Sequence, residues 1–370
     1  MIKIAIVPGF KDDTFSSIEK MYIGLDRYLK DKKLMKLVWV VEKVPGGKNP
    51  IFVQKLIENN GEVCFCSTGL FGKFLTLYKI FRTHKIDVVW THFGAIRYFA
   101  QIVGKIAGCK TVLNVHGEYL AEWRKGQKIK QLLCKICIDN YIGVSEFVLK
   151  PFEVYGNTYL LHNAINLCGS EFINEEELNG FREQYGIPKN KQIITMVSAF
   201  RKEKRHRLMI EIFSKILSQY DNVLLFLAGD GETRSEIHEL IKERDIAHSV
   251  IMSGHISNVN LLYAVSDILV LPSENEPFGM VLLEAMYNKL PVVASKSGGV
   301  PEFIVNGLEG LLIDKDNESS AFVSNLIGLL EQDKLRQEIG QNARKKVARS
   351  YNIDLWFEKQ TKILEQITKN

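Results

Sequence analysis

Two glutamates, Glu276 and Glu284, offer the clearest chemistry in this sequence. Glu276 follows an apolar run typical of a strand, and Glu284 lies inside an apolar helical run from Met280 to Met286. A carboxylate in such a run is costly to bury unless hydroxyl or cationic groups pair with its oxygens. Between the two glutamates, Gly279 permits a close approach to the backbone where the helix begins.

The start of that helix is suited to an anion, because its free N–H groups and partial positive charge favour phosphate. Glu284 lies about five residues further along, roughly 7.5 Å at 1.5 Å per residue. That span approximates the distance from a diphosphate to the ribose of one nucleotide. The pattern therefore fits one ligand whose sugar meets Glu276, whose phosphate meets the helix start and whose ribose meets Glu284. A surface loop and a helix with one satisfied glutamate explain the same spacing equally well.

Strand and helix patterns alternate along the whole chain of 370 residues. Such alternation predicts parallel βαβ units, and two sets of them predict an α/β protein with two doubly wound domains. The length also favours two cores over one. We predict domains at 1–168 and 169–350, followed by a helix over 351–370 for which the first domain offers a docking face. The predicted strands are Lys3–Val7, Lys36–Val41, Asp87–Thr91, Thr111–Val115, Tyr141–Val144, Thr158–Leu161, Ile193–Val197, Val223–Ala228, Val250–Met252, Ile268–Leu271, Val292–Ala294 and Leu311–Ile313.

Ligands of open parallel sheets bind beyond the carboxyl ends of the strands. In both halves of this chain those ends carry glycines, small residues and ionisable residues, which predicts an interdomain cleft. Arg201 and Lys204 follow one such strand and can grip a diphosphate, although a solvated basic turn explains them too. His116 ends another strand and can hydrogen-bond a sugar or phosphate oxygen or move a proton. A lone histidine in such a place is more often structural.

The net charge of +5 hides an asymmetry, because residues 1–170 hold 24 Lys and Arg against 14 Asp and Glu. A basic half indicates an anionic partner, such as nucleic acid or a membrane surface. Basic and apolar residues interleave over 71–82 and 123–130, which fits a helix on anionic lipid. We therefore expect a membrane surface and no nucleic acid, with a solvated basic face as the alternative.

Several common function classes lack support in the sequence. No apolar run reaches the length of a membrane span, and the N-terminus reads as a strand, so we expect a cytoplasmic protein. Cys134 and Cys137 have zinc-like spacing without a second pair. Asp314 and Asp316 spell a cation-binding pair but read better as a loop and helix cap, so no metal is expected. Hydrolase elbows and Walker loops are absent.

Taken together, these motifs resemble the retaining family 4 glycosyltransferases, which have two Rossmann-like domains in the GT-B fold. The resemblance runs through nearly the whole second half and more loosely through the first. Its segments are Leu227–Glu232, Leu271–Gly279, Leu283–Met286, Pro291–Ser295, Gly298–Glu302, Asn114–Gly117, Ile142–Glu146 and His162–Asn166.

The resemblance implies transfer of a hexose-like sugar from a nucleoside diphosphate sugar, UDP-linked, to an acceptor hydroxyl with retention and without a metal or other cofactor. A glycan or glycolipid acceptor in cell-surface polysaccharide assembly, bound by the first domain, is the expected partner. Glu276 would hold donor-sugar hydroxyls, Lys204 would neutralise the diphosphate and His116 would lie beside the donor sugar. Arg201 is expected to replace an arginine that similar proteins carry where this chain has Ala199. The implied donor-binding positions are Gly9, Gly254, His255, Ile256, Phe278, Gly279, Met280 and Glu284.

Two other functions fit parts of the pattern. A non-catalytic GT-B scaffold that binds nucleotide without turnover is compatible with Ala199, but the intact glutamate pair argues against it. A nicotinamide-dependent oxidoreductase is disfavoured because Gly229-Asp-Gly231 lacks the G-x-G-x-x-G order of a dinucleotide fold.

Overall fold

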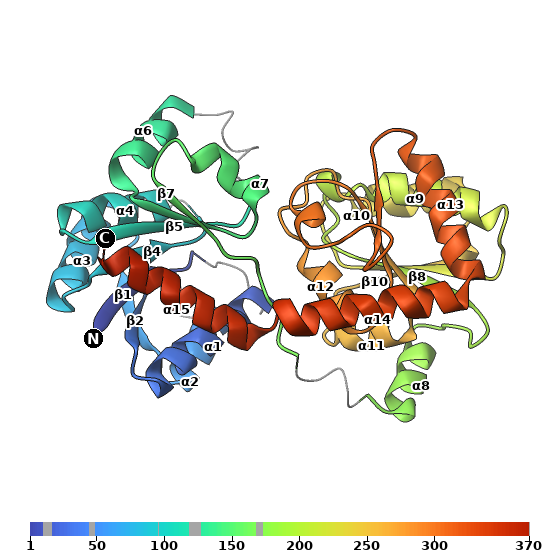
Figure 1. The fold of residues 1–370 in the computed structure, drawn as a ribbon, viewed down its shortest axis with the longest axis horizontal. Helices are drawn as coiled ribbons and strands as arrows, with labels where there is room; N and C mark the ends of the chain where they lie inside the picture. The colour runs from blue at the N-terminus through green and yellow to red at the C-terminus, as the bar shows by residue number, and fades with distance from the viewer. Residues whose placement is uncertain (10–16, 44–48, 95, 118–126, 168–172, 370) are drawn as a thin grey trace. The chain divides into compact units, whose positions relative to one another are not determined.

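The chain folds into two compact units, each built on one parallel sheet (Figure 1). Unit 1 comprises Met1–Asn163 with Ile353–Asn370, and unit 2 comprises Ala164–Asn352. The computed structural model describes residues 1–9, 17–43, 49–94, 96–117, 127–167 and 173–369. The expected domain boundary at 168/169 falls outside these described residues. The prediction of an α/β chain with two doubly wound parallel sheets is confirmed.

Unit 1 contains a seven-stranded sheet in the order β3-β2-β1-β4-β5-β6-β7. Its central strands are buried apolar runs, as expected for parallel strands covered by helices on both faces. Its core joins residues such as Ala5, Val38, Val89, Leu77 and Val103. The elements are β1 (Ile2–Val7), α1 (Ser17–Asp31), β2 (Met35–Glu42), α2 (Ile51–Glu58), β3 (Glu62–Cys66), α3 (Leu70–Thr83), β4 (Val88–Thr91), α4 (Ile96–Ile106), β5 (Lys110–Val115), α6 (Gln127–Cys137), β6 (Asn140–Gly143), α7 (Glu146–Leu149), η1 (Lys150–Phe152), β7 (Asn157–Leu160) and α15 (Ile353–Lys369).

The last helix, α15, packs against α1 inside unit 1 (Figure 1). The Trp356 ring meets the Tyr22 ring edge-on with centroids 5.6 Å apart. A Cβ on Gly24 would lie 2.8 Å from the Phe357 ring, so the glycine allows the two helices to approach closely. The end of the chain therefore completes the core of the unit that its beginning forms.

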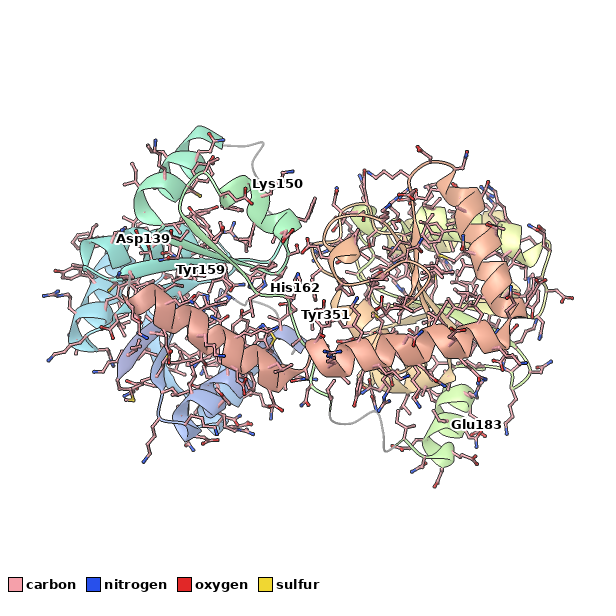
Figure 2. The ribbon with its side chains drawn as sticks, in the orientation of Figure 1. Asp139, Lys150, Tyr159, His162, Glu183 and Tyr351 are labelled. Carbon is pink, nitrogen blue, oxygen red and sulfur yellow. The ribbon has the colours of Figure 1, made fainter. Side chains whose placement is uncertain are left out.

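Asp139, just before β6, ties the start of that strand to β5 (Figure 2). Its Oδ2 accepts hydrogen bonds from the Thr111 backbone N–H at 3.1 Å and the Thr111 hydroxyl at 2.8 Å. These bonds fix the register of β5 and β6 at their amino ends. The position of His116, which follows the carboxyl end of β5, is set by the same register.

Unit 2 contains a six-stranded sheet in the order β10-β9-β8-β11-β12-β13. Its core joins residues such as Ile194, Phe213, Leu225, Val270 and Leu326. The elements are α8 (Glu175–Gln184), β8 (Gln192–Val197), η3 (Lys202–Lys204), α9 (His206–Leu217), β9 (Val223–Ala228), α10 (Arg234–Glu243), η4 (Ala247–Ser249), β10 (Val250–Gly254), α11 (Val259–Val265), β11 (Ile268–Leu271), α12 (Met280–Tyr287), β12 (Val292–Ser295), η5 (Val300–Glu302), β13 (Leu311–Ile313), α13 (Glu318–Glu331) and α14 (Asp333–Ser350).

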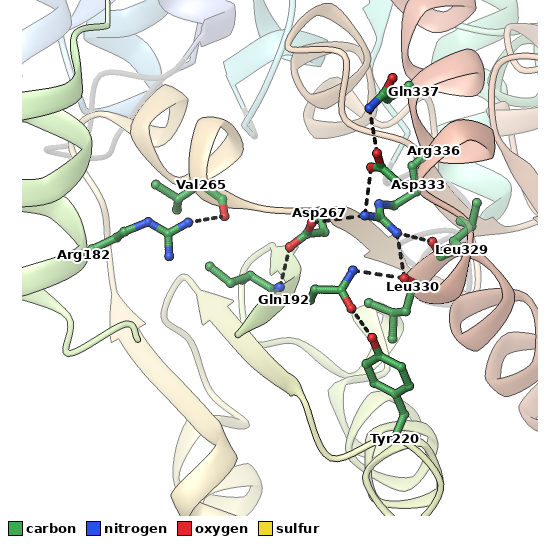
Figure 3. A network of polar contacts seen from close by, with 11 residues as sticks. Arg182, Gln192, Tyr220, Val265, Asp267, Leu329, Leu330, Asp333, Arg336 and Gln337 are labelled. Atoms are coloured by element: carbon green, nitrogen blue, oxygen red, sulfur yellow. Dashed lines mark hydrogen bonds and ion pairs between the residues drawn. The ribbon is translucent and has the colours of Figure 1, made fainter. Parts of the chain in front are cut away.

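A polar network fastens the amino ends of β8 and β11 in unit 2 (Figure 3). Asp267 accepts from the Ile193 N–H at 2.8 Å and lies 3.8 Å from the Arg336 guanidinium. Burial raises the pKa of Asp267, and the Ile193 N–H and Arg336 oppose that rise. Gln192 donates to the Leu330 carbonyl at 3.0 Å. With these ends fixed, the carboxyl ends of both strands present their loops in a defined register.

All the predicted strands are present, and their ends match the structure or differ from it by one or two residues. Strand β3, Glu62–Cys66, at the edge of the first sheet, is not among the predicted strands. Its residues are mostly half-buried and lack a continuous β-branched run, so the local pattern is weak. Pairing with β2 makes it a strand.

Candidate functional site

Glu276 lies in the loop between β11 and α12, at the carboxyl end of the second sheet. Its side chain is nearly covered, with the residue 6% exposed. Gly279 caps α12 with φ of 91°, a backbone conformation that favours glycine. A Cβ there would lie 2.9 Å from Leu282 and 3.3 Å from the Glu276 side chain. The glycine therefore lets Glu276 lie directly against the start of the helix.

Lys204 makes an ion pair with Glu276, although 72 positions separate them in the sequence. Its Nζ lies 2.6 Å from Glu276 Oε2. The lysine side chain is 22% exposed and the glutamate side chain 8% exposed, so the pair is largely shielded from water. An ammonium group carries three N–H donors, and Glu276 takes one of them. The pair thus places further cationic donors and a carboxylate side by side at the start of α12.

The short helix η3, which carries Lys204, is fastened to neighbouring loops on both sides. Arg205 has the left-handed backbone conformation, with φ of 58°. Its guanidinium makes a bidentate salt bridge to the Glu318 carboxylate, with N–O distances of 2.8 and 2.7 Å. The same carboxylate accepts from the Ser295 hydroxyl at 2.8 Å. The Glu274 N–H donates to the Glu203 carbonyl at 2.9 Å. These bonds set the position from which Lys204 reaches Glu276.

The turn at Ser297–Glu302 supports the loop of Glu276 from the neighbouring strand, β12. The Gly299 N–H donates to the Glu276 carbonyl at 2.9 Å. A Cβ on Gly298, whose φ is 60°, would lie 2.0 Å from that carbonyl oxygen, so any side chain there would displace the loop. The Ser297 hydroxyl donates to the Ser273 carbonyl at 2.8 Å. This turn therefore holds the loop by two backbone contacts and one side-chain hydroxyl.

A buried histidine, His206, lies under the turn that carries Lys204. Its ring stacks on Phe200 with centroids 4.0 Å apart, and its Nε2 lies 3.2 Å from the Ser198 hydroxyl. Burial, followed by the charge of Lys204, lowers the pKa of His206 to about 4. The ring is therefore neutral near pH 7 and adds no charge to the site.

Glu284 faces a different partner from Glu276. The Tyr263 hydroxyl, on α11, donates to Glu284 Oε2 at 3.1 Å. Burial, and then the Glu284 charge, raise the pKa of Tyr263, so its hydroxyl stays a donor. The carboxylate is half-buried. Each glutamate thus has a protein partner, Glu276 in the loop just before α12 and Glu284 within that helix.

The other predicted positions of unit 2 lie in the loops and element ends before and after these two glutamates in the chain. Phe278 is buried against Phe303, with centroids 4.7 Å apart, and anchors the start of α12. Gly254 ends β10 with φ of 72° and accepts from the Gly229 N–H at 2.8 Å. The remaining predicted positions are the exposed His255 and Arg201 and the half-buried Ile256 and Met280.

In unit 1, His116 follows β5 and contacts a second histidine. Its Nε2 lies 3.1 Å from His92 Nδ1 and 3.0 Å from Asn114 Nδ2. The Phe93 ring stacks on it with centroids 4.3 Å apart. Burial, and then the charge of Arg97, lower the pKa of His116 to about 3. His116 is thus neutral near pH 7.

Gly9 follows β1 with φ of 66°, and a Cβ there would lie 2.1 Å from the Phe93 carbonyl oxygen. This contact joins the loop ends after β1 and β4. Gly9 also borders a pocket of about 400 Å³ at the carboxyl ends of β1, β2 and β3. Its lining is mostly apolar and includes Val7, Val40, Val53, Phe65 and Ile96.

The sequence patterns do not reveal the contacts that position the site, which involve Tyr263, Arg205, Glu318, Ser295 and Ser297. Each acts through a contact between segments far apart in the sequence. Arg205 had one local signal, since it lies in the basic run after β8 that the sequence reading had singled out. Asp314 Oδ1 lies 3.1 Å from Lys296 Nζ, and no group of three His, Cys, Asp or Glu side chains among the described residues could hold a metal ion.

A family model described as "Glycosyl transferases group 1" matches residues 179–346. N-acetyl-alpha-D-glucosaminyl L-malate synthase from Bacillus anthracis is 34% identical over 337 residues, covering 81% of this chain and 88% of that protein. UDP-Gal:alpha-D-GlcNAc-diphosphoundecaprenol alpha-1,3-galactosyltransferase from Escherichia coli is 24% identical over 300 residues, covering 75% of each chain.

Solved structures resemble the fold over its whole length. The Anabaena protein HepE in complex with UDP and glucose superimposes with a TM-score of 0.83 at 19% identity, covering 99% of this chain and 100% of that one. A glycosyltransferase from Rickettsia africae gives a TM-score of 0.81 at 20% identity, covering 100% and 99%. The two-sheet architecture is therefore that of the GT-B fold.

Proposed function

This chain belongs to the group 1 glycosyl transferases, the family 4 type with the GT-B fold, and from that premise we propose its reaction. It moves a sugar from a nucleoside diphosphate sugar, UDP-linked, to an acceptor hydroxyl. The anomeric configuration is retained and no metal is needed. Support for a UDP-linked donor comes from relatives whose names carry UDP-Gal or whose structures hold UDP.

One observation carries this proposal: the ion pair of Lys204 and Glu276 at the start of α12. A departing diphosphate needs cations and N–H donors, and Lys204 and the helix start supply both. A sugar needs acceptors for its hydroxyls, and Glu276 supplies a carboxylate next to that cation. The pair thus matches the junction of sugar and diphosphate in the donor.

The difficult step is departure of the diphosphate from an oxocarbenium-like carbon. Lys204 would stabilise the negative charge that develops on the leaving oxygen, and Arg201 would approach the outer phosphate. Glu284 would accept from the ribose hydroxyls, with Tyr263 holding its second oxygen in place. The acceptor hydroxyl attacks from the face that the diphosphate leaves and passes its proton to the departing phosphate. This order of events produces retention.

A panel of nucleoside diphosphate sugars, assayed in EDTA, tests the proposal. We expect slow hydrolysis of one donor without added acceptor, and undiminished rates with the chelator, because protein cations replace the metal. The proton NMR coupling constant of the anomeric proton in a transfer product should show the same configuration as the donor. Binding of UDP with no turnover of any donor would instead indicate a non-catalytic scaffold, and a strict Mg²⁺ or Mn²⁺ requirement would revive the pair Asp314 and Asp316.

We further propose that the acceptor is a lipid-linked glycan in cell-surface polysaccharide assembly, reached at the inner face of the cytoplasmic membrane. The name of the Escherichia coli relative includes a diphosphoundecaprenol-linked acceptor. The pocket beside Gly9 gives unit 1 an apolar place for an acceptor. No helix in the described part of the chain has the length and hydropathy to cross a bilayer.

The outer face of α3 suits contact with anionic lipid. Phe71, Leu75, Tyr78 and Arg82 follow each other at helical spacing on its exposed side. Phe71 is 76% exposed and Leu75 is 50% exposed, which is unusual for large apolar residues on one stripe. The exposed basic residues Lys79 and Arg82 lie beside this apolar stripe, as expected for an interfacial helix. The second basic segment that the sequence reading assigned to lipid, 123–130, lies largely outside the described residues.

The double variant Phe71→Ser with Leu75→Ser should bind phosphatidylglycerol vesicles about tenfold or more weakly than the native chain. Each large apolar side chain contributes about 1.5–3 kcal/mol when fully buried, so partial insertion of two suffices for that change. Sedimentation with vesicles measures the effect. Val154→Ser removes a comparably exposed apolar side chain elsewhere in unit 1 and is the matched control. Equal sedimentation of all three proteins would refute a lipid role for α3.

A further inference from the structure

Away from the candidate site, a thiol, an imidazole and a carboxylate contact one another in series at the edge of the first sheet. Glu62 and Cys64 lie two positions apart on β3, so their side chains point to the same face of the strand. The ring of His84, which caps the C-terminus of α3, lies 3.6 Å from Cys64 Sγ through Nε2 and 3.1 Å from Glu62 Oε1 through Nδ1. Lys36 Nζ lies 2.6 Å from the second oxygen of that carboxylate. Because the thiol and the carboxylate contact opposite nitrogens of the ring, the three side chains do not converge on a metal ion.

These contacts fix the direction of the hydrogen bonds in the series. A carboxylate paired with an ammonium group only accepts, so the proton of the His84 ring lies on Nδ1 and is donated to Glu62. The neutral ring then has a lone pair on Nε2, and this nitrogen faces the thiol. A nucleophile, a base in contact with it and a third group that orients the base are the parts of an activated nucleophile.

We propose that Cys64 is a site of reversible modification by small disulfides, with His84 as its base and Glu62 as the residue that positions the base. As Cys64 Sγ attacks one sulfur of the disulfide, its proton passes to His84 Nε2. The S–S bond of the disulfide breaks, a new bond joins Cys64 to the attacked sulfur, and the departing thiolate takes the proton from His84. One disulfide, the oxidant, is consumed and one thiol is released. The site is independent of the proposed sugar transfer.

The thiol requires a base because it is not ionised by itself. Burial, and then the charge of Glu62, raise the pKa of Cys64. Near pH 7 the sulfur therefore carries its proton, and a thiol is a poor nucleophile until that proton is removed. Cys64 is only half-buried, and the side chains of Glu62 and His84 are each 30% exposed, so a small molecule can reach the sulfur.

The other described cysteines are not placed to form an internal disulfide with Cys64. Cys66 points to the same face of β3 about 6.6 Å further along, whereas the Cβ atoms of a disulfide are about 3.5–4.5 Å apart. Cys66, Cys109 and Cys134 are buried. Cys137 lies on α6, which leads into β6, five places from β3 in the sheet. A thiol group from outside the chain must therefore cap an oxidised Cys64, and a mixed disulfide is the expected product.

Hydroxyethyl disulfide, an uncharged probe, tests this site in the whole protein, with the modified peptides followed over time by mass spectrometry. Cys137 is the internal control, because it is also half-buried, its pKa is also raised by burial, and it contacts no histidine in the described part of the chain. We expect Cys64 to react at least about tenfold faster than Cys137 at pH 7, since a positioned base contributes about 10²–10⁴-fold. Dithiothreitol should restore the free thiol. Equal rates at the two cysteines would overturn the proposal.

Two variants distinguish base catalysis from simple ionisation of the thiol. His84→Gln removes the base and should slow the reaction of Cys64 at least about tenfold. Glu62→Gln gives opposite signs for the two routes. Because the Glu62 charge raises the pKa of Cys64, its loss would speed a reaction through the ionised thiol, whereas the loss of a positioning carboxylate slows a reaction through His84.

Glu58→Gln, which removes an exposed carboxylate on α2, is the matched control and should leave the rate at Cys64 unchanged. Thermal unfolding verifies that each variant keeps the fold, as expected for partly exposed side chains. A native rate in His84→Gln would show that the histidine is not the base. A faster reaction in Glu62→Gln would show that the carboxylate acts only through its charge on the thiol, and either result would overturn the assignment.

Discussion

Glu276→Ala should lower kcat for sugar transfer by about 10²–10³-fold, the size of effect seen when one group that stabilises a transition state is removed. The carboxylate lies 2.6 Å from Lys204 and directly beside the start of α12. Its loss removes the acceptor that is proposed to hold the sugar hydroxyls while the diphosphate departs. Steady-state kinetics with the donor selected from the panel measures the change.

Two further variants test whether the effect is specific to the Glu276 carboxylate. Glu276→Gln retains the shape and one acceptor oxygen, so it should fall between the native chain and the alanine variant. Glu274→Gln removes a carboxylate that is exposed two residues earlier in the same loop, and it should leave kcat near the native value. Thermal unfolding checks that the fold persists, since the Lys204 side chain remains partly exposed to water when its partner is gone. Near-native transfer by Glu276→Ala would remove Glu276 from the proposed chemistry.

Lys204→Ala should lower kcat by about 10²–10³-fold through a different effect, the loss of a cation at the leaving diphosphate. Unlike Glu276→Ala, it should also weaken binding of UDP itself, because the charge faces phosphate and not the sugar. Titration calorimetry with UDP and with the UDP-sugar distinguishes the two variants. Undiminished UDP affinity in Lys204→Ala would place the lysine away from the diphosphate.

Lys202→Ala is the matched control for this experiment. Lys202 lies on the same short helix, η3, and its side chain is exposed. It removes the same charge from the same turn without touching Glu276. A general effect of positive potential would lower UDP affinity in both variants to a similar degree, whereas a specific contact predicts a large loss for Lys204→Ala only.

Most of the strands can be predicted from the sequence, whereas their order in each sheet is known only from the structure. Continuous buried runs such as Val223–Ala228 identify central parallel strands from sequence, because both of their faces are apolar. The edge strand β3 escapes because most of its residues are only half-buried. Its assignment depends on pairing with β2, a contact that no local window contains.

In the candidate site, too, some features can be predicted from the sequence and others cannot. Glu276, Gly279 and Glu284 stand out in the sequence because a short motif holds all three. The partner that each glutamate receives does not stand out: Lys204 comes from the loop after β8, and Tyr263 from α11. His92 and His116 are 24 positions apart in the sequence, yet the structure places their ring nitrogens 3.1 Å apart. Such pairs form only when neighbouring strands bring their ends together.

The path of the chain has a consequence for synthesis. Unit 2 is continuous in sequence, whereas unit 1 consists of residues 1–163 and the terminal segment 353–370. On a ribosome, residues 1–163 of unit 1 emerge early but lack α15 until all of unit 2 has been made. Until then Tyr22 and Gly24 of α1 have no Trp356 or Phe357 to cover them. The nascent protein therefore depends on residues 353–370 to close its first domain, and a stop codon ahead of residue 353 would leave that domain open.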